Sequence, residues 1–172
     1  KALAGVTVYE LTDTQRDALE DKQGNHYLDA GGLSITGPGN SASGEWLDVV
    51  RDLDWLTARL REASIAVFAS NDKVTFTDEG ISLLLAAIRK VLNEAVTKTV
   101  LAASPKFTLT APRAADVSVA NKQLRHLPSV EFNAALAGAI HSIAITGNVS
   151  AGGTAHERRE VLRLESGIRL PR

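Results

Sequence analysis

The chain has 172 residues, a hydrophobic fraction of 44% and a formal net charge of -1 at pH 7. These values suit one globular domain, alone or with an arm, and they argue against intrinsic disorder. A net charge near zero gives no electrostatic reason to expect nucleic acid or an anionic membrane as a partner. The sequence has no cysteine, so it forms neither a disulfide bond nor a thiolate metal site.

The most apolar run of the chain, residues 81–103, is interrupted by four charged side chains. Charges spread through such a run argue against a helix that spans a bilayer. No signal peptide is visible, and position 1 is not methionine. We therefore expect Lys1 to open a fragment or a trimmed chain.

The first predicted helix begins after Thr12. Thr12 and Gln15 have the spacing of a capping box, and Gly24 fits the left-handed position that follows a last helical turn. Between them only Ala18 and Leu19 are apolar, so this helix is expected to lie on the surface.

A short strand over 25–30 and a Gly- and Ser-rich stretch over 31–44 come next. Leu33 and Ile35 are placed to pair back on the strand as a hairpin. The stretch precedes a helix, which invites a phosphate-binding interpretation, but it lacks the Lys-Ser/Thr pair that completes a P-loop. A plain loop is the favoured interpretation.

The central predicted helix covers 45–61 and is the element on which we expect the fold to pack. Its apolar residues recur with helical period, and it holds both tryptophans of the chain. Two large rings on one amphipathic helix bury much apolar area. The predicted core positions are Trp46, Val49, Leu53, Leu56 and Leu60.

A further helix is predicted to follow Thr77, which is a good N-cap with two acidic residues after it, and to end before Ser104-Pro105. From residue 106 onward the apolar period changes to two, which indicates strands. Residues 130–136 and 143–149 are expected to form a hairpin, with a short helix over 118–125 before them. The apolar residues of these predicted strands, which are also the candidates for pairing with another chain, are Phe107, Leu109, Val130, Phe132, Ile143, Ile145 and Val149.

These elements predict an α+β fold of two layers, with helices packed on one face of a mostly antiparallel sheet. We expect one domain over 1–151. Residues 152–172 carry many charges among scattered apolar residues and are expected to form a charged C-terminal arm or a tail that is not native to the protein.

No pattern in the sequence specifies a catalytic, cofactor-binding or metal-binding residue. The four histidines lack the spacing of three or four on one helix that a metal face needs, and no serine stands in Gly-x-Ser-x-Gly. Asp48 and Asp52 could act as an acid–base pair, but a solvated helix face is the favoured interpretation. We therefore expect no enzyme activity, cofactor or metal.

Several blocks of the sequence resemble a known family in order and spacing. The most specific block is Gly-Glu-Trp-Leu-Asp-Val-Val-Arg, and the resemblance covers roughly residues 2–151. The blocks are Leu3-Ala-Gly-Val6, Leu11-Thr, Ser43-Gly-Glu-Trp-Leu-Asp-Val-Val-Arg-Asp-Leu-Asp-Trp-Leu56, Thr77-Asp-Glu-Gly-Ile81, Ala115-Asp-Val-Ser118 and Leu136-Ala-Gly-Ala-Ile-His141. This set is similar to the C-terminal, tube-proximal domain of the tail sheath proteins of contractile bacteriophages.

The resemblance implies a structural protein of the virion tail sheath, made in the cytoplasm of the bacterial host. Such subunits form a helical homopolymer around the tail tube protein, respond to the baseplate, and contract to drive the tube through the host envelope. Arms from neighbouring subunits add strands to the sheet of this domain. The family implies no cofactor, no catalytic residue, no nucleic acid and no membrane partner.

The strand residues allow the same interpretation without the family. An unpaired strand edge offers N–H and C=O groups to another chain, which makes it a joint in a polymer. The alternative is that these strands only complete the sheet of a monomer. A different class of function is also open: a small-ligand or partner-binding α+β module in which the Gly31–Gly44 loop lines the entrance of the binding pocket.

Overall fold

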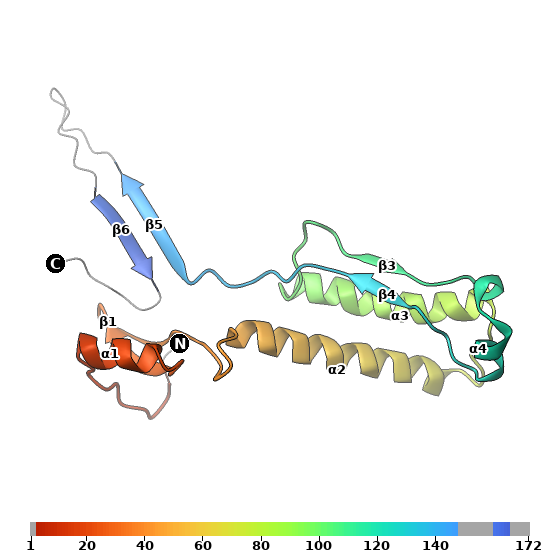
Figure 1. The fold of residues 1–172 in the computed structure, drawn as a ribbon, viewed down its shortest axis with the longest axis horizontal. Coiled ribbons are helices and arrows are strands. Elements are labelled where there is room, and N and C mark those ends of the chain that lie inside the picture. The colour runs from red at the N-terminus through yellow and green to blue at the C-terminus, as the bar shows by residue number, and fades with distance from the viewer. Residues whose placement is uncertain (1–2, 148–159, 166–172) are drawn as a thin grey trace, which may run out of the picture. The chain divides into compact units, whose positions relative to one another are not determined.

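The computed structural model describes residues 3–147 and 160–165, and Figure 1 shows their helices and strands. The chain divides into two units, one made of Lys1–Asp48 with Ala139–Arg172 and the other of Val49–Gly138. The predicted α+β class is confirmed. The described strands form three separate two-stranded antiparallel ladders rather than one sheet.

In the first unit, helix α1 (Asp13–Glu20) begins with the predicted capping box. The Gln15 N–H donates to Thr12 Oγ1 at 3.3 Å, and the Thr12 N–H donates to Gln15 Oε1 at 3.0 Å. The left-handed residue after the helix is Gln23, with φ of 60°, so the prediction for Gly24 is wrong. Gly24 is required for space instead, because a Cβ there would lie 2.7 Å from Leu19 Cγ.

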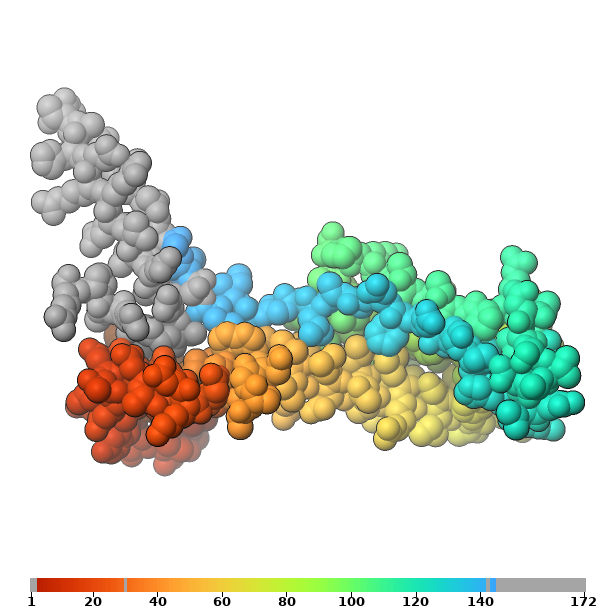
Figure 2. All heavy atoms as spheres, in the orientation of Figure 1, coloured from red at the N-terminus to blue at the C-terminus, as the bar shows by residue number. Residues whose placement is uncertain are grey.

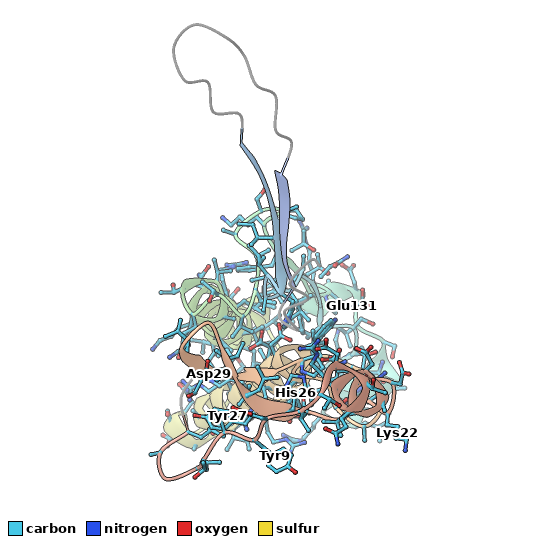
Figure 3. The ribbon with its side chains drawn as sticks, turned by 90° about the vertical axis from the view of Figure 1, so that its left-hand side faces the viewer. Tyr9, Lys22, His26, Tyr27, Asp29 and Glu131 are labelled. Atoms are coloured by element: carbon cyan, nitrogen blue, oxygen red, sulfur yellow. The ribbon has the colours of Figure 1, made fainter. Side chains whose placement is uncertain are left out.

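The predicted hairpin after α1 is confirmed. Strand β1 (His26–Ala30) pairs antiparallel with β2 (Leu33–Gly37), and the chain reverses through two glycines with positive φ, Gly31 and Gly32. The N-terminal segment runs beside β1, where the Tyr9 N–H donates to the Tyr27 carbonyl at 3.4 Å (Figure 3).

Side-chain hydrogen bonds hold the loop that follows β2. Asn25 Oδ1 accepts from the N–H groups of Gly39 and Asn40 at 2.7 and 3.0 Å, and Asn25 Nδ2 donates to the Asn40 carbonyl at 2.7 Å. The Gly- and Ser-rich stretch is therefore tied to the turn between α1 and β1.

The remaining ladder of this unit joins β5 (Ser142–Gly147) to β6 (Glu160–Glu165), in register from Ser142 opposite Glu165 to Gly147 opposite Glu160. The predicted pairing of 130–136 with 143–149 is therefore wrong. Alternation of apolar residues identifies a strand and its faces, but it carries no information about which strand lies beside it. Val149 lies outside the described residues.

The second unit is built on two long helices, α2 (Leu47–Ser70) and α3 (Asp78–Thr97). The first two residues of α2, Leu47 and Asp48, belong to the first unit. The predicted cap of α3 is confirmed, since the Gly80 N–H donates to Thr77 Oγ1 at 3.3 Å. A Cβ at Gly80 would lie 2.0 Å from the Thr75 carbonyl oxygen, so the chain can enter α3 along this path only with glycine there.

A short ladder of β3 (Thr108–Thr110) and β4 (Glu131–Asn133) lies beside these helices, with Leu109 opposite Phe132 (Figure 1). Between the two strands come a 3-10 turn, η1 (Ala114–Asp116), and the predicted short helix, α4 (Val119–Gln123). An isolated antiparallel bridge joins Leu101 to Leu136. Within this unit the ladder and the helices form the two layers of an α+β arrangement.

The hydrophobic core lies between α2, α3 and the segments that carry the β3–β4 ladder. Leu92 and Ala95 of α3 are completely buried. The buried members of the core cluster are Leu56, Val91, Leu92, Ala95, Val100 and Leu101, and the partly buried ones that pack on it include Trp55, Leu60, Phe107, Leu109 and Leu136.

Two of the five predicted core positions of α2 are exposed. Leu53 is 49% exposed and Trp46 is 38% exposed, whereas Leu56 is buried and Leu60 packs on the core. The buried face of the helix follows Leu56, Leu60 and Ala63. Leu53 lies at the margin of that face, and Trp46 precedes the helix, so helical periodicity does not apply to it.

Candidate functional site

An enzyme active site or a metal site needs several reactive or ligating side chains that lie close together. The described residues contain no group of three His, Cys, Asp or Glu side chains that could hold a metal ion. Asp48 and Asp52, the candidate acid–base pair, lie in the first turns of α2. His26 is buried, and its Nε2 lies 2.8 Å from Glu20 Oε1, so this contact ties β1 to the end of α1.

An open groove of about 410 Å³ runs between α2 and α3. Its floor is made of small apolar side chains, and Arg59 crosses it to contact Glu62 at 2.6 Å and Glu94 at 3.3 Å. The hydrogen bond that Arg59 donates to Glu62, followed by the one that it donates to Glu94, raises the pKa of Arg59. Arg59 is thus paired within α2, through Glu62, and across to α3, through Glu94.

A smaller apolar pocket of about 110 Å³ lies where the end of α2 meets the start of α3. Its lining includes Phe68, Phe76, Ile81 and Leu84, with Arg125 among them. A third, shallow hollow on the outer side of α3 contains Leu83 beside Asp78 and Glu79. One side of α2 is visible along its length in Figure 2, coloured from orange to yellow. None of these three hollows is lined by the Gly31–Gly44 loop.

The strand edges are the other candidate surface. Each described ladder has two strands, so within the described residues each strand has one edge that pairs with no further strand. In β3 and β4, Leu109 is directed to the core, whereas Phe132 is 42% exposed. In β5, Ile143 is 50% exposed. Of the remaining predicted strand residues, Val130 and Phe107 flank the β3–β4 ladder and Ile145 lies within β5.

Two contacts that link distant parts of the chain could not be foreseen from the sequence. The ring of Trp46 stacks on His141, and Asp48 accepts a hydrogen bond from the Ala139 N–H. The partners are about ninety residues apart. No periodicity or motif in the sequence connects these residues.

The fold therefore defines the class of domain: an α+β body built on two long helices, with two-stranded antiparallel ladders. Residues 47–108 match the family model described as E217 tail sheath protein gp31-like, C-terminal domain. This match begins with α2, includes α3 and ends at the first residue of β3. It confirms the predicted resemblance to a phage tail sheath C-terminal domain.

The family points to a structural, non-enzymatic component of a bacteriophage tail. No curated protein matches the chain. Among the helices that the structure describes, none combines the length and the apolar character needed to cross a membrane.

Proposed function

We propose that this chain is part of a contractile tail sheath subunit, which polymerises around the tail tube and contracts to drive the tube through the host envelope. The observation that carries the proposal is the sheath C-terminal domain match over 47–108, in a chain whose strands form two-stranded ladders. The partners in this proposal are further copies of the subunit, the tube protein and the baseplate. The site of action is the virion tail.

Strand addition is the proposed means of assembly. An edge strand presents unpaired N–H and C=O groups, and pairing through them depends little on side chains. Such a joint tolerates sequence change and can persist while subunits rotate as rigid bodies. The candidates are the β3–β4 ladder, through Phe132 and its neighbours, and the β5–β6 ladder, through Ile143 and its neighbours.

The helical unit supplies a rigid body for this role. Its buried cluster joins α2 and α3 to the segments around β3 and β4, so a force on the ladder reaches both helices. In this proposal residues 1–151 form the sheath-like domain and 152–172 a charged arm, of which β6 is the described part.

Electron microscopy of the full-length protein that contains this chain tests the proposal. We expect tubular polymers or polysheaths from the unaltered protein. Proline removes a backbone N–H and disrupts a strand ladder, so Ile143→Pro and Phe132→Pro are expected to abolish polymers if the respective ladder takes part.

The matched controls are Ile143→Ala and Phe132→Ala, which keep the backbone N–H and should still polymerise. The melting temperature of every variant separates lost assembly from lost folding. A full-length protein that remains monomeric under all conditions contradicts the proposal.

The alternative of a ligand-binding module finds no support in the described hollows, because none of them is lined by the Gly31–Gly44 loop. A thermal-shift screen with a small-molecule library decides between the two classes. A specific ligand that raises the melting temperature by several degrees would favour the binding module.

A further inference from the structure

The chain crosses between its two units at two places, Asp48–Val49 and Gly138–Ala139. At each crossing one residue belongs to the first unit, and these two residues, Asp48 and Ala139, are hydrogen-bonded to each other. Asp48 Oδ2 accepts a hydrogen bond from the Ala139 N–H at 3.1 Å. The residue at the start of α2 is thereby fastened to the residue at which the chain returns from the helical unit.

A second contact lies next to this hydrogen bond. The rings of Trp46 and His141 are stacked, with centroids 4.1 Å apart and planes inclined by 18°. The backbone around Trp46 is itself fixed, because Trp46 forms a bridge with Asn40 and the Leu47 N–H donates to the Gly39 carbonyl at 2.9 Å. His141 therefore rests on an anchored ring.

From these contacts we infer that residues 46–48 and 139–141 form a clamp, which fixes the beginning of β5 to the first turn of α2. The electrostatics support a specific role for Asp48. The positive end of the helix dipole stabilises a carboxylate in the first turn. Asp48 Oδ1 is buried and has no hydrogen-bond partner among the described groups, so this carboxylate is not held out in water as an ordinary surface acid would be.

The clamp shortens the mechanical path between β5 and α2. β5 begins at Ser142, directly after His141. Along the covalent chain, the path from Ala139 back to Asp48 passes through the whole of 49–138, whereas the clamp joins them in one step. If neighbouring subunits pull on β5, as the proposed function requires, the pull reaches the first turn of α2 through this clamp.

Amide hydrogen exchange followed by NMR on the 172-residue chain tests whether the clamp exists. We expect the Ala139 amide to be protected, and Asp48→Ala to raise its exchange rate by about tenfold, as loss of one hydrogen bond would. Asp48→Asn keeps an acceptor oxygen and should restore protection. The neighbouring exposed acid gives the control, Glu45→Ala, which should leave Ala139 unchanged.

The stack is tested separately by fluorescence. Trp55→Phe leaves Trp46 as the single tryptophan. In that background we expect His141→Ala and Asp48→Ala both to change the emission of Trp46, whereas Leu47→Ala does not. An unprotected Ala139 amide in the unaltered chain overturns the inference. So does Trp46 emission that is insensitive to both variants.

The use of the clamp in assembly rests on the proposed function and has its own readout. In full-length protein, Asp48→Ala is expected to form polymers that fail to contract as a unit, whereas Glu45→Ala polymers contract normally. If the unaltered protein forms no polymer, the proposed function fails but the exchange and fluorescence results still decide the clamp. If Asp48→Ala polymers contract normally, its mechanical role is overturned.

Discussion

Different kinds of interaction stabilise the interior of each of the two units. Every buried hydrophobic residue that the structure describes lies in 49–138, where α2, α3 and the β3–β4 segments share one apolar cluster. In the unit formed by 1–48 and 139–172, the described interactions are mainly polar. They include the capping box of α1, the hydrogen bonds of Asn25 and the His26–Glu20 contact.

This difference indicates that the helical unit is the more stable part of the chain. Burial of apolar side chains contributes most of the free energy of folding, and hydrogen bonds add modest net amounts. We therefore expect the helical unit to unfold last. The polar unit, whose ladders have open strand edges, is the part expected to gain stability from the strands of neighbouring copies.

Truncating the centre of the apolar cluster is the largest expected effect. Leu92 is completely buried, so Leu92→Ala should lower the free energy of unfolding by about 2–5 kcal/mol. Urea denaturation followed by circular dichroism measures this loss. Leu53→Ala is the control on the exposed margin of α2 and should cost about 1 kcal/mol or less. Equal losses for both variants would mean that the core is misplaced.

The next largest effect concerns the two glycines that admit close contacts. Gly80→Ala places a Cβ against the Thr75 carbonyl, which is backbone and cannot move aside, so we expect a loss of about 1–3 kcal/mol. Gly24→Ala, in the polar unit, meets the Leu19 side chain at 2.7 Å and the Leu19 carbonyl oxygen at 2.9 Å, a backbone contact less close than the 2.0 Å at Gly80. The same urea experiment should therefore show the greater loss at Gly80.

A smaller and more local effect is expected when the polar unit is weakened alone. Asn25→Ala removes three hydrogen bonds to the loop at 39–40. Because these bonds are exposed and water can replace the lost partner, we expect a combined net loss of only about 1 kcal/mol. Hydrogen exchange should rise in β1 and β2 while α3 keeps its protection. Faster exchange in α3 as well would show that the two units unfold together, which would contradict the comparison.

The sequence predicted local structure well wherever one short segment contains the whole signal. The caps at Thr12 and Thr77 and the hairpin return through Leu33 and Ile35 all lie within a few residues of what they determine. Strand partners and the clamp depend on residues far apart in the chain, such as Asp48 and Ala139. No local pattern encodes those pairings, so the hairpin of 130–136 with 143–149 was predicted wrongly and the clamp was not foreseen.

The cap of α3 gives the smallest effect, and its sign follows from the pKa of Glu79. A hydrogen bond from its own backbone N–H and then one with the Thr77 hydroxyl lower that pKa below the ordinary value of 4.5. A depressed pKa in the folded state means that this group stabilises the fold above the unfolded pKa, and that the contribution is lost as the pH falls through the folded value. We expect Glu79→Gln to flatten slightly the acid side of the plot of unfolding free energy against pH, since the side chain is exposed.

NMR titration of the Glu79 carboxyl in the unaltered chain and in Thr77→Ala provides the measurement, and the midpoint should rise in the variant. An unchanged midpoint would show that the Thr77 hydroxyl does not stabilise the charged form of Glu79, although it caps the helix through Gly80.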